Sequence, residues 1–219
     1  MDMTKNTTFH IRVAMTLFLL ILTILAPTSK AWAVDYIDEG GTKQTVNNAT
    51  KLNGSNSGIT LYRNTYYVEG TVTCKGTITL DGNTTIILCD GATLNIGTSG
   101  EPVSGYCING GNYSLTIYGQ TKQTGTIKAY CSGDHSSNIN LSGSYTQHGG
   151  NVNLNGTGAS KGITLDGNNQ KLTLTRGNLT VHTADFAIEL SGSDVSIDIS
   201  GGTLTATATG DNGLAIRGN

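Results

Sequence analysis

The chain has 219 residues, of which 30 are glycine, 2 are proline and 13% are charged, and its formal net charge at pH 7 is −2. No stretch concentrates enough Lys and Arg to follow a phosphate backbone or an anionic membrane, which argues against nucleic acid and membrane surfaces as partners. Gly, Thr and Asn are abundant and no long segment repeats helix formers at a period of 3.6, which is typical of short strands joined by many turns.

The first 33 residues have the features of a secretory signal peptide. A basic start precedes the apolar run Val13–Ala26, which is short of the roughly 20 residues that span a membrane. The triplet Ala31-Trp-Ala33 is a small-x-small cleavage site. We therefore expect a secreted or cell-surface protein without membrane insertion after cleavage; the alternative is an uncleaved N-terminal anchor.

Residues 34–76 are expected to form a polar N-terminal segment followed by a capping coil. The stretch 34–58 is polar and weakly patterned, whereas Thr65–Val68 and Thr71–Cys74 alternate as short strands do. A capping coil covers the strand edges at the end of a repeat array. The repeats themselves are expected over residues 77–219.

An aliphatic-x-aliphatic-x-Gly pattern recurs through these repeats. Its first copy is Ile78-Thr-Leu80-Asp-Gly82. The period of two predicts strands with one buried face, and a glycine at a fixed place after each strand suits a turn with positive φ. Six glycines close the copies at intervals of 24 to 33 residues: Gly82, Gly110, Gly143, Gly167, Gly192 and Gly218.

Each repeat has room for two further strands, for example Leu172–Leu174 and Leu179–Val181. Three strands and three turns in about 25 residues make one coil of a β-solenoid, whose stacked coils join their inward residues into ladders. We predict an all-β fold, a right-handed parallel β-helix with three short strands per coil; the alternative is an antiparallel β-sandwich. One ladder is expected to contain Leu80, Ile108, Leu141, Leu165, Leu190 and Ile216.

Two stretches interrupt this regularity and are expected to be exposed loops, residues 132–137 and 144–150. The chain also stops at Asn219 where a new coil would begin. We therefore expect a fragment of a longer array, with further repeats of the same protein as neighbours.

The four cysteines are Cys74, Cys89, Cys107 and Cys131, and their spacing matches no zinc pattern. Secretion would permit disulfides, and four cysteines allow three complete pairings between which the sequence does not choose. The favoured interpretation is that they are small buried hydrophobic residues on strands, and a disulfide framework is the alternative. Neither a metal nor another cofactor is expected.

Three segments, Tyr66–Val72, Ile86–Leu94 and Asn112–Gln120, carry a resemblance to a known class of protein, and the segments 201–206 and 213–218 also fit it. Over residues 60–219 the chain resembles a repeat region in large surface proteins of gut-type bacteria. It is similar to bacterial carbohydrate-binding β-helix domains and adhesin-like proteins. The resemblance implies a secreted β-helix that contacts polysaccharide, and it carries over no ligand residues.

Two tyrosines are the candidate ligand-binding residues. Tyr118 follows an inward Ile117, and Tyr130 follows an inward Ala129, so both are expected to face outward. Flat aromatic rings offer the apolar surface on which the C–H faces of sugars stack. We therefore expect a binding or adhesion module, not an enzyme, whose partner is a polysaccharide or cell-surface glycan.

A β-helix polysaccharide lyase is the enzyme alternative, because such an enzyme needs clustered acids for calcium and a basic residue beside them. Asp194 and Asp198 are expected to face outward, with Lys171 near Asp194 on the preceding coil. They form a weak calcium candidate, but the favoured interpretation is an exposed ion pair. The second alternative is a non-binding structural stalk of a larger surface protein.

Overall fold

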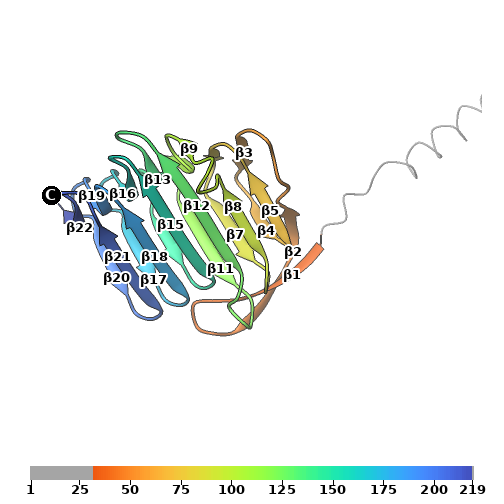
Figure 1. Ribbon diagram of the computed structural model, residues 1–219. Coiled ribbons are helices and arrows are strands. Elements are labelled where there is room, and N and C mark those ends of the chain that lie inside the picture. Colours follow the sequence, from red (N-terminus) through yellow and green to blue (C-terminus); the bar gives the residue numbers. More distant parts are fainter. Residues whose placement is uncertain (1–31, 219) are drawn as a thin grey trace, which may run out of the picture. The chain divides into compact units, whose positions relative to one another are not determined.

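The computed structural model describes residues 32–218, which form strands and turns and contain no helix (Figure 1). The predicted signal peptide, residues 1–33, lies outside this part except for Trp32 and Ala33. Within the described part no helix has the length and apolar character to cross a membrane. The prediction of an all-β fold is confirmed for this part of the chain.

Three sheets contain the strands, and we call them sheets I, II and III. Sheet I has the order β1 (Trp32–Ile37), β2 (Lys43–Lys51), β4 (Thr65–Val68), β7 (Thr84–Leu88), β11 (Leu115–Gly119), β14 (Tyr145–Gln147), β17 (Lys171–Leu174) and β20 (Ser196–Ile199). Sheet II has the order β5 (Thr71–Cys74), β8 (Thr93–Ile96), β12 (Thr126–Ser132), β15 (Asn151–Thr157), β18 (Asn178–Thr183) and β21 (Thr203–Ala208), with the short β9 (Val103–Ser104) beside β12. Sheet III has the order β3 (Ile59–Tyr62), β6 (Ile78–Asp81), β10 (Ile108–Gly111), β13 (Ser137–Leu141), β16 (Lys161–Leu165), β19 (Phe186–Leu190) and β22 (Leu214–Gly218).

Neighbouring strands are parallel in all three sheets, apart from the antiparallel pair β1–β2. From β4 to β22 the chain visits sheets I, II and III in turn, with β9 as an additional strand of sheet II. Each strand therefore pairs with the strand that occupies the same place in the previous round. This parallel pairing excludes the antiparallel β-sandwich.

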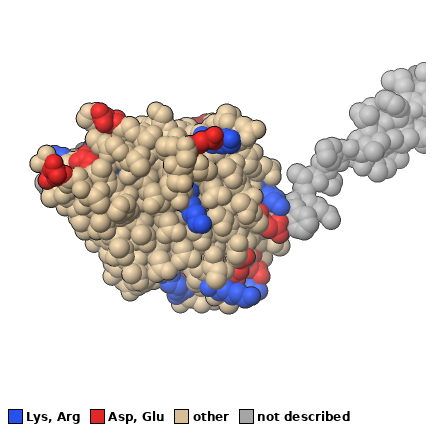
Figure 2. Space-filling view, viewed as in Figure 1, with Lys and Arg blue, Asp and Glu red and all other residues tan. Residues whose placement is uncertain are grey.

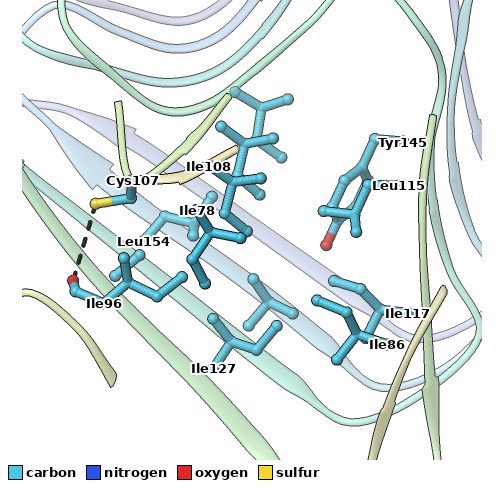
Figure 3. Packing of buried hydrophobic residues seen from close by; sticks show 14 of the residues in the cluster. Ile78, Ile86, Ile96, Cys107, Ile108, Leu115, Ile117, Ile127, Tyr145 and Leu154 are labelled. Atoms are coloured by element: carbon cyan, nitrogen blue, oxygen red, sulfur yellow. Dashed lines mark hydrogen bonds between the residues drawn. The ribbon is translucent and has the colours of Figure 1, made fainter. Parts of the chain in front are cut away.

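The inward side chains of the three sheets fill a common apolar core. Figure 3 shows Ile86 and Ile117 of sheet I, Ile96 and Ile127 of sheet II and Ile108 of sheet III converging on it, all of them fully buried. Parallel pairing stacks equivalent residues, so each inward position becomes a continuous row along the molecule.

One predicted ladder is wrong at two positions. Leu141, Leu165 and Leu190 do pair in one row. Ile108 instead pairs with Ile78 and Ile139, and Ile216 pairs with Ile188. Leu80 pairs with Leu61, and the residue beside it in β10 is Gly110. A two-residue shift keeps the same side chains inward, so alternation alone could not reveal this error.

The six repeat glycines were predicted to provide positive φ angles in turns, but most of them serve another purpose. Gly82 has the expected positive φ, 142°, whereas the other five do not. A Cβ atom on Gly167 would collide with the carbonyl oxygen of Ser142, and one on Gly192 with the carbonyl oxygen of Gly167. These glycines therefore let consecutive rounds of the backbone approach closely. Gly110 and Gly218 lie inside strands, where Gly218 pairs with Leu190.

The prediction of an exposed loop over residues 144–150 is also wrong. Its first half forms β14, in which Tyr145 and Gln147 point into the core and are fully buried. The phenol of Tyr145 donates a hydrogen bond to Oε1 of Gln147 over 2.9 Å. The Gln147 amide donates to the carbonyl oxygens of Gly150 at 3.2 Å and Asn178 at 3.1 Å. Polar residues thus replace aliphatic ones inside the core because their hydrogen bonds are satisfied there.

The N-terminal hairpin, β1 and β2, is a feature that the sequence did not predict. It joins sheet I where Thr50 and Lys51 pair with β4. Val34 and Ala49 of the hairpin pack in a second apolar cluster, apart from the core, with Tyr67 and Ile87 of sheet I. We call residues 33–51 the strap, because they cover the outer face of sheet I (orange in Figure 1).

Candidate functional site

The outer face of sheet II is an ordered array of small polar side chains, which we call the polar face. Parallel pairing arranges these residues in rows along the molecule. The first row is Thr71, Thr93, Thr126, Asn151, Asn178 and Thr203; the second is Thr73, Asn95, Lys128, Asn153, Thr180 and Thr205; the third is Tyr130, Asn155, His182 and Thr207. Neighbours in a row are separated by the strand spacing of about 4.8 Å.

The polar face is almost free of formal charge. Lys128 is the only Lys, Arg, Asp or Glu in the three rows. The face seen in Figure 2 has the same character, with most acidic and basic side chains gathered toward its margins. A surface of this kind offers hydrogen bonds and does not select ligands by charge.

Some amides of the polar face are held in place and others are free. The Asn178 amide donates to Oδ1 of Asn151 over 2.8 Å, and the Asn151 amide donates to the carbonyl oxygen of Gln123 over 3.0 Å. The side chains of Asn153 and Asn155 make no hydrogen bond to another residue within the part of the chain described. A primary amide provides two donor hydrogens and an acceptor oxygen, so these two can bind a polar ligand without first losing a partner.

Tyr130 lies on the polar face, so the prediction that its side chain faces outward is confirmed. It belongs to β12, pairs with Asn155 of the next round and is partly buried. Its neighbour Lys128, two residues earlier on the same strand, is exposed. Tyr130 is therefore an aromatic side chain at the border of an otherwise amide- and hydroxyl-rich surface.

Tyr118 also faces outward but lies on sheet I, so the structure does not bring the two predicted tyrosines together. Its ring centroid is 4.6 Å from that of Tyr36 in the strap and 4.9 Å from that of His148, with which it stacks. Burial raises the pKa of the Tyr118 phenol. The Tyr118 ring packs against Tyr36 of the strap and against His148. Tyr118 therefore helps to hold the strap and offers little surface to a sugar.

Polar contacts extend the attachment of the strap along sheet I. The Gln120 amide donates to the carbonyl oxygen of Asp35 over 2.9 Å. Farther along, Nη1 of Arg176 donates to the carbonyl oxygen of Asp38 over 3.1 Å. Between these two points Nε2 of His148 lies 3.8 Å from Oε2 of Glu39. The strap is thus tied to three successive turns of the chain.

A cleft of about 490 Å³ opens beside the strap, within the size range of small-molecule sites. Among its lining residues, Lys51 forms an ion pair with Glu69 at 2.7 Å. Asp35 is paired with Lys43 at 2.6 Å, and this bond lowers the pKa of the Asp35 carboxyl group. Asp90 accepts hydrogen bonds from the backbone N–H of Lys122. The charged groups of the cleft are therefore already engaged with protein partners.

The weak calcium candidates do not form a cluster. The register pairs Lys171 with Ser196, and Nζ of Lys171 contacts Oδ2 of Asp198 at 3.3 Å rather than Asp194. Asp194 lies in a turn with a positive φ of 55°. Among residues 32–218 no group of three His, Cys, Asp or Glu side chains is placed to hold a metal ion. The Lys171–Asp198 contact is an exposed ion pair.

Sequence reasoning missed the asparagine rows, although a signal for them existed. The segment Asn151-Val-Asn-Leu-Asn155 alternates amide and aliphatic residues, which assigns the three amides to one outer face. Comparison of the chain with protein-family models, with curated proteins and with solved structures finds no match. The resemblance to bacterial surface proteins therefore stays a prediction.

Proposed function

We propose that this protein is a secreted or cell-surface binding module that holds polysaccharide on the outer face of a right-handed, three-sided parallel β-helix. The regular visiting of sheets I, II and III supports the β-helix. The right-handed sense of the helix is supported by the general rule that connections between parallel strands of one sheet are right-handed. The signal-peptide pattern of residues 1–33 supports export.

The observation that carries the proposal is the polar face, whose rows consist mainly of Thr and Asn. Sugar hydroxyl groups both donate and accept hydrogen bonds, as do amides and hydroxyls of the protein. Successive sugar units of a polymer can place their hydroxyl groups against successive side chains of these rows. Each hydrogen bond contributes only about 0.5–1.5 kcal/mol, so affinity depends on many of them acting together.

The ligand we propose is a neutral polysaccharide. An anionic polymer would meet Lys128 as the only charged partner in the three rows, which is too little positive charge for binding by charge attraction. Tyr130 supplies the apolar contact that amides and hydroxyls lack, because a sugar ring can stack on the face of an aromatic ring and Tyr130 is only partly buried. Asn155 beside it can accept or donate to the same sugar.

Co-sedimentation of the full chain with a panel of insoluble neutral and acidic polysaccharides, with and without calcium, tests the proposal. We expect selective retention on a neutral polymer, independent of calcium and without release of soluble sugar. The double variant Tyr130→Ala, Asn155→Ala should lower the affinity about tenfold or more, which corresponds to roughly 1.4 kcal/mol. Release of unsaturated sugar would instead favour the lyase.

The matched control is Thr79→Ala, an exposed outward position on β6 of sheet III. It removes a polar side chain from a different face and should leave retention unchanged. Equal loss of binding in the control and in the double variant would contradict a site on sheet II. Absence of retention on every polymer would overturn the binding function and leave a structural stalk.

A further inference from the structure

Two of the four cysteines meet at a buried corner between sheets II and III. Cys131 is the sixth residue of β12 in sheet II, and Cys107 directly precedes β10 in sheet III. Their exposed fractions are 1% and 0%. Figure 3 shows Cys107 beside Ile96, whose carbonyl oxygen lies 3.8 Å from its sulfur. Residues 24 apart in the sequence are thus brought together in the same part of the core.

The two thiols lie beside the same short segment, where the hydroxyl of Ser136 is 4.0 Å from the sulfur of Cys131 and Asn138 approaches the sulfur of Cys107. Each thiol also shifts the pKa of the other. The surrounding backbone fixes this arrangement. The short strand β9 pairs with β12 through Val103 and Cys131, only four residues before Cys107. The Asn138 amide lies 3.8 Å from the sulfur of Cys107. The pair therefore lies in an ordered and partly polar environment.

The other two cysteines have different surroundings. Cys74 is buried in β5, and burial raises the pKa of its thiol. Cys89 lies between β7 and β8, is half-buried, and has Glu69 and Asp90 as charged neighbours. Neither has a cysteine among these contacts. The structure therefore brings one pair together and keeps the remaining two thiols out of it.

We propose that Cys107 and Cys131 form a disulfide bond when the chain folds under oxidising conditions, and that Cys74 and Cys89 remain thiols. With glutathione disulfide as the oxidant, one protein thiolate attacks it, forms a mixed disulfide and displaces one glutathione. The second protein thiolate then attacks the protein sulfur of the mixed disulfide and displaces the other glutathione. Two protein thiols lose two electrons, and one glutathione disulfide becomes two glutathione thiols.

The bond has a clear structural effect. Both side chains lie at one buried corner, and a disulfide brings their sulfurs to the bonded separation of about 2.05 Å. The bond closes the loop from Cys107 to Cys131 and ties the irregular segment around β9 to β12. Closing such a loop restricts the unfolded chain and so stabilises the folded one. The inference does not depend on what the polar face binds.

Disulfide mapping of the full chain tests this proposal. The protein is unfolded in guanidinium with reductant, refolded in a mixture of reduced and oxidised glutathione, alkylated under denaturing conditions and digested. We expect one cross-linked peptide pair that joins Cys107 and Cys131, with Cys74 and Cys89 alkylated. Four alkylated cysteines, or a cross-link that contains Cys74 or Cys89, would overturn the proposal.

Thermal unfolding provides a second measurement, which does not need a cross-linked peptide. Reductant should lower the Tm of the wild-type chain by roughly 5–10 °C. The variant Cys131→Ala should show no dependence on reductant. The control Cys89→Ala retains the Cys107–Cys131 pair and should keep the full shift. A wild-type Tm that does not respond to reductant would contradict a stabilising bond.

Discussion

The outer faces of sheets I and II differ although both sheets are built from the same kind of parallel strands. The outer face of sheet I also carries a row of threonines, Thr85, Thr116 and Thr146. Beside that row lie the apolar or aromatic residues Tyr67, Ile87 and Tyr118, against which the strap packs. On sheet II the outward residues are Thr and Asn, with Lys128 and Tyr130 among them, and they form the polar face. The inward faces are alike, since both contribute aliphatic residues to one core.

This difference shows that the residues at the outward positions determine whether another segment of the chain covers a face. An apolar outward residue gains free energy when another part of the chain removes it from water, at about 25 cal/mol per Å² of apolar surface. Thr and Asn gain little from such covering, because their polar groups must then find new partners. Sheet I therefore holds part of its own chain, whereas the polar face of sheet II would gain little from being covered in the same way.

Removing Ile87 is the most direct way to make sheet I resemble sheet II. Ile87 is fully buried between its sheet and the strap. The variant Ile87→Ala leaves a cavity there, and we expect the free energy of unfolding to fall by about 3 kcal/mol. Guanidinium denaturation followed by circular dichroism measures this loss.

The matched control is Thr180→Ala on the polar face, which should change the free energy of unfolding by less than about 0.5 kcal/mol. Thr180 lies in the second row of sheet II, between Asn153 and Thr205. If both variants lost the same amount, the covering of sheet I would not explain the difference between the two faces.

The far end of the strap provides a smaller effect. Arg176 donates to the carbonyl oxygens of Asp38 at 3.1 Å and Glu39 at 3.4 Å. We expect Arg176→Ala to lower the free energy of unfolding by about 1 kcal/mol and to speed proteolysis within residues 38–42. Limited proteolysis followed by mass spectrometry locates the cleavage, and Lys128→Ala on the polar face is the charge-matched control. Unchanged cleavage in Arg176→Ala would show that the apolar contacts alone hold the strap.

The alternating pattern predicted the inward residues of the repeats well, because burial on one face repeats every second residue. It could not fix the register between rounds, as the misplaced Ile108 and Ile216 show. Gly110 occupies a strand position between Leu80 and Leu141, where a Cβ atom would collide with the Leu141 side chain. Only the packing of neighbouring rounds determines that a glycine belongs inside β10 and not after it.

The candidate site was predicted in part. Tyr130 could be assigned to an outer face because Ala129 and Cys131 beside it are inward. The packing of Tyr118 could not, since it depends on Tyr36, a residue 82 positions earlier in the sequence. One local signal existed: Ile86, Ile87 and Leu88 are three apolar residues in succession. In a strand with a single buried face the middle one would be exposed, so such a run indicates that the outer face is also covered.

The smallest of these effects concerns pH. His148 packs on Tyr118 beneath the strap, and its Nδ1 lies 2.8 Å from Oγ1 of Thr175. Burial lowers the pKa of His148 below its ordinary value of 6.5, although the nearby Glu39 acts in the opposite direction. The unfolded chain then binds a proton more readily than the folded one. Stability should therefore decrease as the pH falls below about 6.5, and the loss should be complete once the pH is below the folded pKa.

Denaturation of the wild type and of His148→Gln at pH 7, 6 and 5 separates this effect from other titrations. The carboxyl groups of Asp35 and Asp38 have pKa values below 3.8, so they stay ionised over this range. We expect the wild type to lose more stability than the variant between pH 7 and 5, because the variant has no imidazole to protonate. Equal losses would contradict the lowered pKa, because they would mean that His148 is as easily protonated under the strap as in the unfolded chain, with the attraction of Glu39 cancelling the effect of burial.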